Sequence, residues 1–394
     1  MNNQDDFVFW SLTKSLICEQ GYRVVQLFEN QKELWLEKLE NKKAPIIRML
    51  RQDLDWSNSM QRDIEIVASN GERIRKQLGR NELNVLNVYV SPYPPVDEYE
   101  FRINRPYASP EISKTTVETV LMSRQQYQPG FIRLSEVTGI PIHFSIEGNF
   151  LLEDVEKVKQ DALDYAVKEI NIEKALFNFG KPLFTYVFIL IQVAVFLFLE
   201  AKGGSTNSMV LIRYGAKFNP LIMDGEWWRF ITPIFLHIGF MHLAMNSLAL
   251  YYLGTTVERI YGNARFIMIY LFAGISGSIA SFIFNIHISA GASGAIFGCF
   301  GALLYFGTNY PKLFFRTMGK NVLAILLINL VFDFTASGID NAAHLGGLAG
   351  GFLATGIVHF PKRKKPLLQI LFLIFSVAII SASLYYGFHN SSFK

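Results

Sequence analysis

This sequence has few cysteines, a small net charge and no recognisable signal peptide at its amino terminus. Its two cysteines, Cys18 and Cys299, lie in different parts of the chain, which gives no sign of a disulfide framework and favours a reduced, intracellular setting for the soluble part. The net charge is only +4 and no basic stripe stands out, so nucleic acid is not an expected partner. The amino terminus, MNNQDDFVFW, is acidic and lacks the basic region of a signal peptide, so an internal apolar segment must direct membrane insertion.

Hydrophobic residues are abundant and unevenly spread, at 51% of the 394 residues. Residues 1–178 alternate charged and apolar positions as a soluble domain does. From Leu183 onward, apolar runs reach the roughly 20 residues that a membrane-spanning helix needs. We therefore predict a polytopic α-helical membrane protein with an amino-terminal α+β domain. Its predicted parts are a cytoplasmic domain over 1–178, a membrane core over 179–362, and a further transmembrane helix and tail over 363–394.

The amino-terminal domain is predicted from helical spacings and from short strand-like runs joined by Asn/Lys-rich turns. Phe9, Leu12 and Leu16 recur at helical spacing before Gly21. The signal between 100 and 150 is weak. A charged helix follows at 152–175, with an apolar stripe of Val155, Val158, Ala162 and Tyr165. The remaining predicted elements are strands at 22–28, 34–36, 46–50 and 85–90, and a polar helix over 56–78 that Gly71 could interrupt.

Seven membrane segments are predicted, separated by glycine-rich or polar stretches. They cover residues 183–200, 236–256, 265–286, 293–310, 321–337, 341–360 and 366–388. Basic residues lie in the second, fourth and sixth connections, the last of which holds the KRKK run at 362–365, and basic connections are typically cytoplasmic. This places the amino-terminal domain in the cytoplasm, and the carboxyl terminus and the long connection 201–235 on the opposite side.

Polar residues in apolar segments need a reason, because lipid does not solvate them. Ser293, in the sequence SAGASGAIFG, lies at the outer, amino-terminal end of the fourth segment, where free N–H groups favour an anion. Gly291 and Gly294 leave room for a substrate backbone. His344, in NAAHLGGLAGG, lies at a comparable depth, and glycine spacings on both segments allow close approach. We predict that Ser293 is a nucleophile and that His344 is its general base. Taken singly, Ser293 is more simply a small residue at a helix start, and His344 a buried structural histidine.

His242 and Asn246 lie four residues apart and therefore share a face of the second segment. Each can point an N–H group at a developing negative charge, so we predict that they line an oxyanion hole. The plainer alternative is a polar pair that joins helices. His237, five residues before His242, is predicted to face elsewhere as a structural histidine near the lipid boundary. Trp228 and Arg229 are predicted to anchor the long connection, the arginine by binding loop carbonyls.

These motifs resemble, in order and spacing, the rhomboid family of intramembrane serine proteases. The resemblance covers residues from about 183 to 360, and the soluble front domain and GEWWRFITPIFLHIG resemble the form found in Gram-positive bacteria. It implies that Ser293 and His344 are a catalytic dyad and that His242 and Asn246 line the oxyanion hole, with no cofactor or metal. It also implies single-span membrane proteins in the lipid bilayer as substrates, with small residues at the cut and helix-weakening residues nearby.

One position departs from the family pattern. Many bacterial rhomboids have a tyrosine four residues after the serine, stacked on the histidine, and this chain has Phe297 there. Stacking could survive, but no role of a phenolic hydroxyl carries over. The family works without a carboxylate partner for the histidine. Asp333 and Asp340 are the nearest candidates for such a partner, and the sequence leaves that question open.

Three other classes fit the sequence less well. A rhomboid-like protein that only binds clients would usually lack the serine or the histidine, and both are present. A membrane metalloprotease needs HExxH, which does not occur, and a transporter would show matching halves. The fifth segment and the loop at 335–340 are assigned by position as gate and cap. The front domain could bind a regulator, a substrate or, through acidic residues such as Asp63 and Asp97, a divalent cation; a solvated surface is the plainer interpretation.

Overall fold

The computed structural model describes residues 3–109, 112–124, 127–139, 141, 151–336 and 338–389. The chain divides into two compact units, Met1–Ile172 and Glu173–Lys394. The boundary between them lies within helix α5 (Leu152–Phe177).

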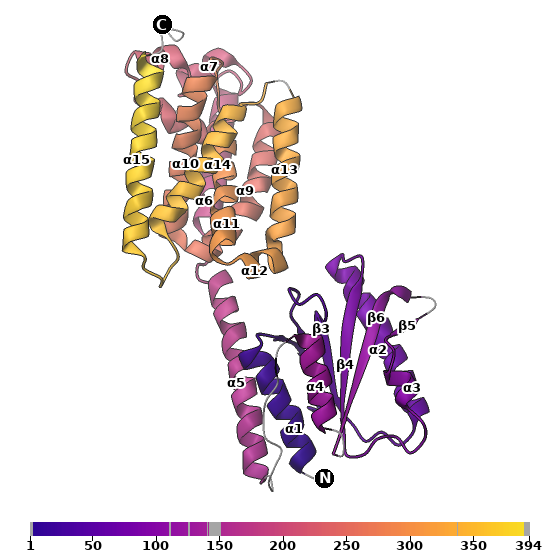
Figure 1. Ribbon diagram of the computed structural model, residues 1–394. Helices are drawn as coiled ribbons and strands as arrows, with labels where there is room; N and C mark the ends of the chain where they lie inside the picture. Colours follow the sequence, from indigo (N-terminus) through magenta and orange to yellow (C-terminus); the bar gives the residue numbers. More distant parts are fainter. Residues whose placement is uncertain are drawn as a thin grey trace. The chain divides into compact units, whose positions relative to one another are not determined.

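The amino-terminal unit is a mixed sheet with helices on both faces (Figure 1). The sheet order is β1-β2-β3-β4-β6-β5, in which β1 to β3 form an antiparallel meander and β3, β4 and β6 run parallel. The strands are β1 (Arg23–Leu27), β2 (Glu33–Glu37), β3 (Ile46–Arg51), β4 (Leu83–Ser91), β5 (Tyr107–Ser109) and β6 (Ile112–Ser123). The helices are α1 (Asn3–Lys14), continued by the π-turn η1 (Ser15–Glu19), α2 (Ser57–Leu78), α3 (Glu100–Ile103) and α4 (Tyr127–Thr138).

Side-chain alternation along the strands divides the core of this unit into two layers. Ile47 and Met49 of β3 pack in one layer with α1 and α4, whereas Ile46 and Leu50 pack in the other with α2. Successive strand residues point to opposite faces, so a strand covered on both sides carries apolar residues on both faces. This explains the apolar residues on both faces of β3, where the buried Arg48 is paired with Glu33 and Asp63.

The predicted strands and helices of this unit are confirmed, with two corrections. The interruption at Gly71 is wrong, because α2 continues through it; a Cβ atom there would lie 2.8 Å from Thr115 Cγ2, so the glycine lets the helix lie close to the sheet. In α5, Val155 and Ala162 are buried, but Tyr165 is 37% exposed and lies outside the apolar stripe. The weak signal between 100 and 150 missed β6 and α4, and residues 142–150 lie outside the described residues.

Helices occupy all seven predicted membrane segments of the second unit. They are α6 (Phe184–Ala201), α9 (Phe240–Tyr261), α10 (Asn263–Phe284), α11 (Ser293–Asn309), α13 (Lys320–Thr335), α14 (Asn341–Val358) and α15 (Pro366–His389). The shorter elements are α7 (Ser208–Arg213), α8 (Asn219–Met223), η2 (Trp227–Phe230), η3 (Thr232–Phe235), α12 (Pro311–Phe314) and η4 (Phe315–Gly319). Within the described residues, four stretches are long and apolar enough to cross a membrane: Phe184–Ala201, Asn263–Phe284, Pro311–Thr335 and Pro366–His389. The three other long helices, α9, α11 and α14, carry the candidate site.

Helix α14 packs between α10 and α11, while α15 and α13 lie at the two flanks of the unit (Figure 1). A Cβ atom on Gly347 of α14 would lie 2.6 Å from Gly294 C and 2.9 Å from Gly294 Cα on α11. One turn further on, a Cβ atom on Gly351 would lie 2.5 Å from Gly298 C. The two helices therefore touch backbone to backbone, which confirms the predicted close approach of the fourth and sixth segments.

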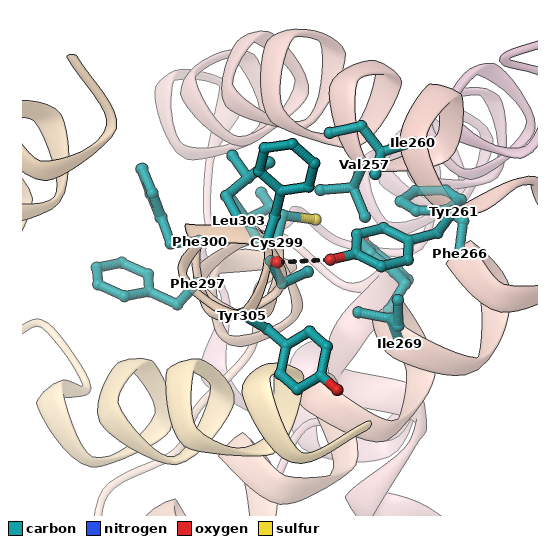
Figure 2. Close-up of a cluster of buried hydrophobic side chains, with 14 of the residues drawn as sticks. Val257, Ile260, Tyr261, Phe266, Ile269, Phe297, Cys299, Phe300, Leu303 and Tyr305 are labelled. Atoms are coloured by element: carbon teal, nitrogen blue, oxygen red, sulfur yellow. Dashed lines mark hydrogen bonds between the residues drawn. The ribbon is translucent and has the colours of Figure 1, made fainter. Parts of the chain in front are cut away.

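The hydrophobic core of this unit is rich in aromatic side chains and contains buried hydrogen bonds. Figure 2 shows Tyr261 donating to Ala302 O at 3.0 Å among apolar side chains that include Val257 and Leu303. Nearby, the fully buried Glu258 carboxylate accepts the N–H groups of Leu183, Phe184 and Thr185 at 2.8 to 2.9 Å. These are free donors at the start of α6, so the buried carboxylate caps that helix.

Candidate active site

Ser293 is the first residue of α11 and is half-buried. The extended segment that precedes Ser293 is held in place because the Gly291 N–H donates a hydrogen bond to Pro233 O at 2.9 Å. The first N–H groups of a helix have no partner within the helix and carry its positive dipole end. The Ser293 hydroxyl therefore lies beside backbone donors suited to an oxyanion.

His344 lies in the first turn of α14 and is 8% exposed. Its ring stacks on Phe297, with ring centroids 4.3 Å apart and planes inclined by 13°. Its Nδ1 lies 2.6 Å from Oδ2 of Asp333, a residue of α13 that is 4% exposed. A carboxylate accepts hydrogen bonds, so Nδ1 carries a proton and the lone pair of the neutral ring is on Nε2.

His242 and Asn246 meet the loop before the serine from α9. A Cβ atom on Gly291 would lie 2.7 Å from His242 Cε1, 2.9 Å from its Nε2 and 3.6 Å from Asn246 Nδ2. Glycine at 291 therefore keeps open the space in front of His242, and Asn246 lies within van der Waals reach of the same point. Asn246 is 7% exposed, and its Nδ2 has no hydrogen-bond partner among the described residues. A buried amide donor left unpaired costs free energy, which indicates a group that awaits an acceptor.

His237 is placed differently from the prediction. It is fully buried rather than at a lipid boundary, and its ring packs edge-on against His242 with centroids 5.4 Å apart. Its Nε2 accepts the Ala292 N–H at 3.4 Å. The spacing argument failed because α9 begins only at Phe240, so the five residues from His237 to His242 are not all helical. His237 therefore supports the loop that presents Ser293.

Arg229 and Trp228 lie in η2, away from the serine. Arg229 donates to Ile212 O at 2.7 Å and Ala216 O at 2.8 Å, and its Nε donates to Glu226 at 2.6 Å. The arginine thus binds loop carbonyls as expected. Trp228 is 45% exposed, a position that suits a side chain at a membrane interface.

The two aspartates near His344 have different partners. Asp340 precedes α14 and caps it by accepting the Ala343 N–H at 3.1 Å, and its other oxygen accepts the Ser281 hydroxyl. Asp333 contacts the imidazole itself. An acidic residue inside the apolar fifth segment was the sequence signal for this contact, but spacing alone could not choose between the two.

The fold and these contacts define a multi-pass helical membrane protein in which a serine, histidines and an unpaired amide converge at helix ends. Residues 224–361 match the family model described as the rhomboid domain. The chain is 42% identical over 398 residues to rhomboid protease GluP of Bacillus subtilis (strain 168), covering 98% of this chain and 76% of that protein. It is 28% identical over 221 residues to rhomboid protease AarA of Providencia stuartii, covering 49% of this chain and 78% of that protein.

The chain therefore belongs to the rhomboid family of intramembrane serine proteases, in the form found in Gram-positive bacteria. It is a serine endopeptidase that acts on membrane-protein substrates within the lipid bilayer. All the candidate site residues, from Trp228 to His344, fall inside the matched rhomboid domain.

Proposed function

We propose that Ser293 and His344 are the catalytic dyad and that His242 and Asn246, with the Ser293 N–H, bind the oxyanion. A substrate helix enters from the bilayer and partly unwinds, because a helical peptide bond is shielded by its own turn. His344 Nε2 takes the hydroxyl proton as Ser293 Oγ attacks the scissile carbonyl. The tetrahedral intermediate collapses to an acyl-enzyme, and the departing amine takes the proton from His344. Water then hydrolyses the ester with His344 again as base.

The orientation of His344 is the observation that carries the proposal. Asp333 engages Nδ1 and Phe297 fixes the ring plane, so Nε2 is the nitrogen left for a hydroxyl. Close packing of α14 on α11 brings the two helix starts together. Among the described residues no hydrogen bond joins Ser293 to His344, and catalytic hydrogen bonds often tighten only once substrate binds.

The basic connections support a membrane orientation for this activity. We assign the amino-terminal domain to the cytoplasm, and the carboxyl terminus and the opening of the active site to the outer side, because the KRKK run at 362–365 and the other basic connections share one side. On this orientation, water reaches the acyl-enzyme from outside. We assign α13 and the loop at 335–340 as lateral gate and cap, since α13 exposes Ile328 and Phe332; Ser337 of that loop lies outside the described residues.

A cation role for the amino-terminal domain gains no support from its contacts. Asp63 is engaged by Arg48 at 2.5 Å and by the Tyr89 hydroxyl, and Asp97 accepts the Ser57 N–H and hydroxyl, each at 2.7 Å. Within the described part of the chain, no group of three or more His, Cys, Asp or Glu is arranged to hold a metal. We assign this domain only the recruitment of a substrate or regulator.

Cleavage of a single-span reporter by purified protein in detergent tests the dyad. We expect Ser293→Ala and His344→Ala to abolish cutting. The thermal unfolding midpoint of Ser293→Ala should stay close to that of the wild type, whereas that of His344→Ala should fall, because Asp333 is left buried without its partner. The matched controls are Ser381→Ala and His389→Ala on α15, which should cut normally. Persistent cutting by folded Ser293→Ala would refute the mechanism.

A further inference from the structure

We propose that Asp333 is a positioning residue for His344. Its carboxylate holds the imidazole with the proton on Nδ1 and balances the positive charge that forms when Nε2 takes the Ser293 proton. The inference rests on the proposed dyad and extends it from two residues to three.

The geometry constrains the imidazole from two directions. The distance of 2.6 Å between Nδ1 and Oδ2 is short for a nitrogen donor, as expected for a hydrogen bond to a charged acceptor. The Phe297 ring, stacked at 4.3 Å, fixes the plane in which the imidazole can turn. A hydrogen bond within that plane then leaves one orientation for the ring. Nε2 points away from Asp333, on the side of the ring left for the serine.

The position of Asp333 on α13 argues against a purely structural role. It lies in the last turn of that helix, where the dipole is unfavourable to an anion. Its neighbours Phe332 and Phe334 are 61% and 65% exposed, whereas Asp333 is 4% exposed and turned inward. A buried carboxylate needs a partner that compensates its desolvation, and the partner it contacts is His344. Neither capping of a helix nor contact with solvent therefore explains why an aspartate is buried at this position.

The charges around His344 favour the same conclusion. From α9, His242 interacts electrostatically with His344, and His237 packs behind it. On α11 the contacting side chain is the uncharged Phe297. Among the described residues, Asp333 is thus the acidic side chain in contact with the imidazole. Through the cycle the serine proton moves to Nε2, the Nδ1 proton remains on the ring, and Oδ2 of Asp333 continues to accept the hydrogen bond from Nδ1.

Steady-state cleavage of the reporter by Asp333→Asn tests the proposal. An amide can reverse the hydrogen bond and favour the wrong tautomer, so we expect kcat to fall about 10²- to 10⁴-fold. KM should stay within about threefold, because substrate binding does not use this bond. The matched control is Asp224→Asn, the same chemical change on an exposed aspartate at the end of α8. Exposed substitutions away from packed or bonded groups change little, so this control should keep a kcat within about threefold of wild type.

A second pair of variants keeps the test decisive if Asp333→Asn folds poorly. Asp333→Glu retains a carboxylate and should recover at least about tenfold in kcat over Asp333→Gln, which has the same size and no charge. Equal kcat values for the Glu and Gln variants, or a normal kcat for folded Asp333→Asn, would overturn the proposal. His344→Ala in the same assay separates the two levels: if it still cuts, the dyad itself is wrong, whereas if it is inactive and Asp333→Asn is normal, only the role of Asp333 is wrong.

Discussion

Substituting Gly347 by alanine should separate the serine from the histidine. The added Cβ would lie 2.6 Å from Gly294 C, 2.9 Å from Gly294 Cα and closer still to Gly294 O, all backbone atoms that cannot rotate away. Restoring ordinary contact requires a shift of about 1 Å between α11 and α14. Gly294 follows Ser293 and Gly347 lies one turn after His344, so the shift acts directly on the dyad. A displacement of that size can cost about 10² in rate, so we expect kcat to fall roughly 100-fold.

The control is Gly346→Ala, one residue earlier on the same helix. Its Cβ would meet α10 instead, 2.9 Å from Ser276 O and 3.3 Å from Gly277 Cα. Both variants overpack the core and should lose about 1–3 kcal/mol of stability by thermal unfolding in detergent. Gly347→Ala alone introduces a clash between α11 and α14, the two helices that carry the dyad, so its kcat should be at least about tenfold lower than that of Gly346→Ala. Equal kcat values in the two folded variants would refute the reasoning.

Three further predictions concern separate parts of the molecule. Asn246→Ala removes an oxyanion donor and should lower kcat about 10²- to 10³-fold with little change in KM; an equal rise in KM would indicate a substrate-binding role instead. Glu258→Ala leaves the N–H groups of Leu183, Phe184 and Thr185 at the start of α6 without their acceptor. It should cost about 3 kcal/mol in thermal unfolding, and a loss below about 1 kcal/mol would contradict this. Hydrogen bonds from the Ser57 hydroxyl and N–H lower the pKa of Asp97 below its ordinary value of 3.8. The ionised carboxylate therefore stabilises the fold above pH 3.8, and this stabilisation is lost as the pH falls through the lower folded-state pKa. The unfolding midpoint of Asp97→Asn should depend less on pH in that acid range than that of the wild type, and identical pH profiles would contradict the prediction.

The sequence predicted the elements whose spacing is local. Apolar runs located the seven membrane helices, and short strand-like runs and helical periods located most of the sheet unit. The strand β6 was missed because its first half, ISKTTVET, is largely polar although Thr115 and Thr119 are buried in the sheet. Composition cannot distinguish such a strand from a loop, since burial of its threonines depends on neighbours distant in sequence.

The candidate site was predictable only as far as helix faces could be inferred. His242 and Asn246 are four residues apart within α9, so their meeting at Gly291 follows from helical geometry. His237 was misplaced because the start of α9 could not be read from the sequence. The choice of Asp333 over Asp340 as partner of His344 depends on how α13 lies against α14. That packing is set by long-range contacts, which no spacing rule encodes.

Three buried polar residues of this membrane unit differ in whether their polar atoms are paired. Glu258 and Arg229 are buried, and each is paired with backbone groups of its own chain, so each holds an element in place. Asn246 is also buried, but its amide donor has no partner among the described residues and lies beside Gly291, two residues before Ser293. Selection for stability alone would favour pairing or replacing such a donor, because its burial costs free energy. On the mechanism we propose, the oxyanion of a substrate supplies the missing acceptor, bound only while the reaction proceeds.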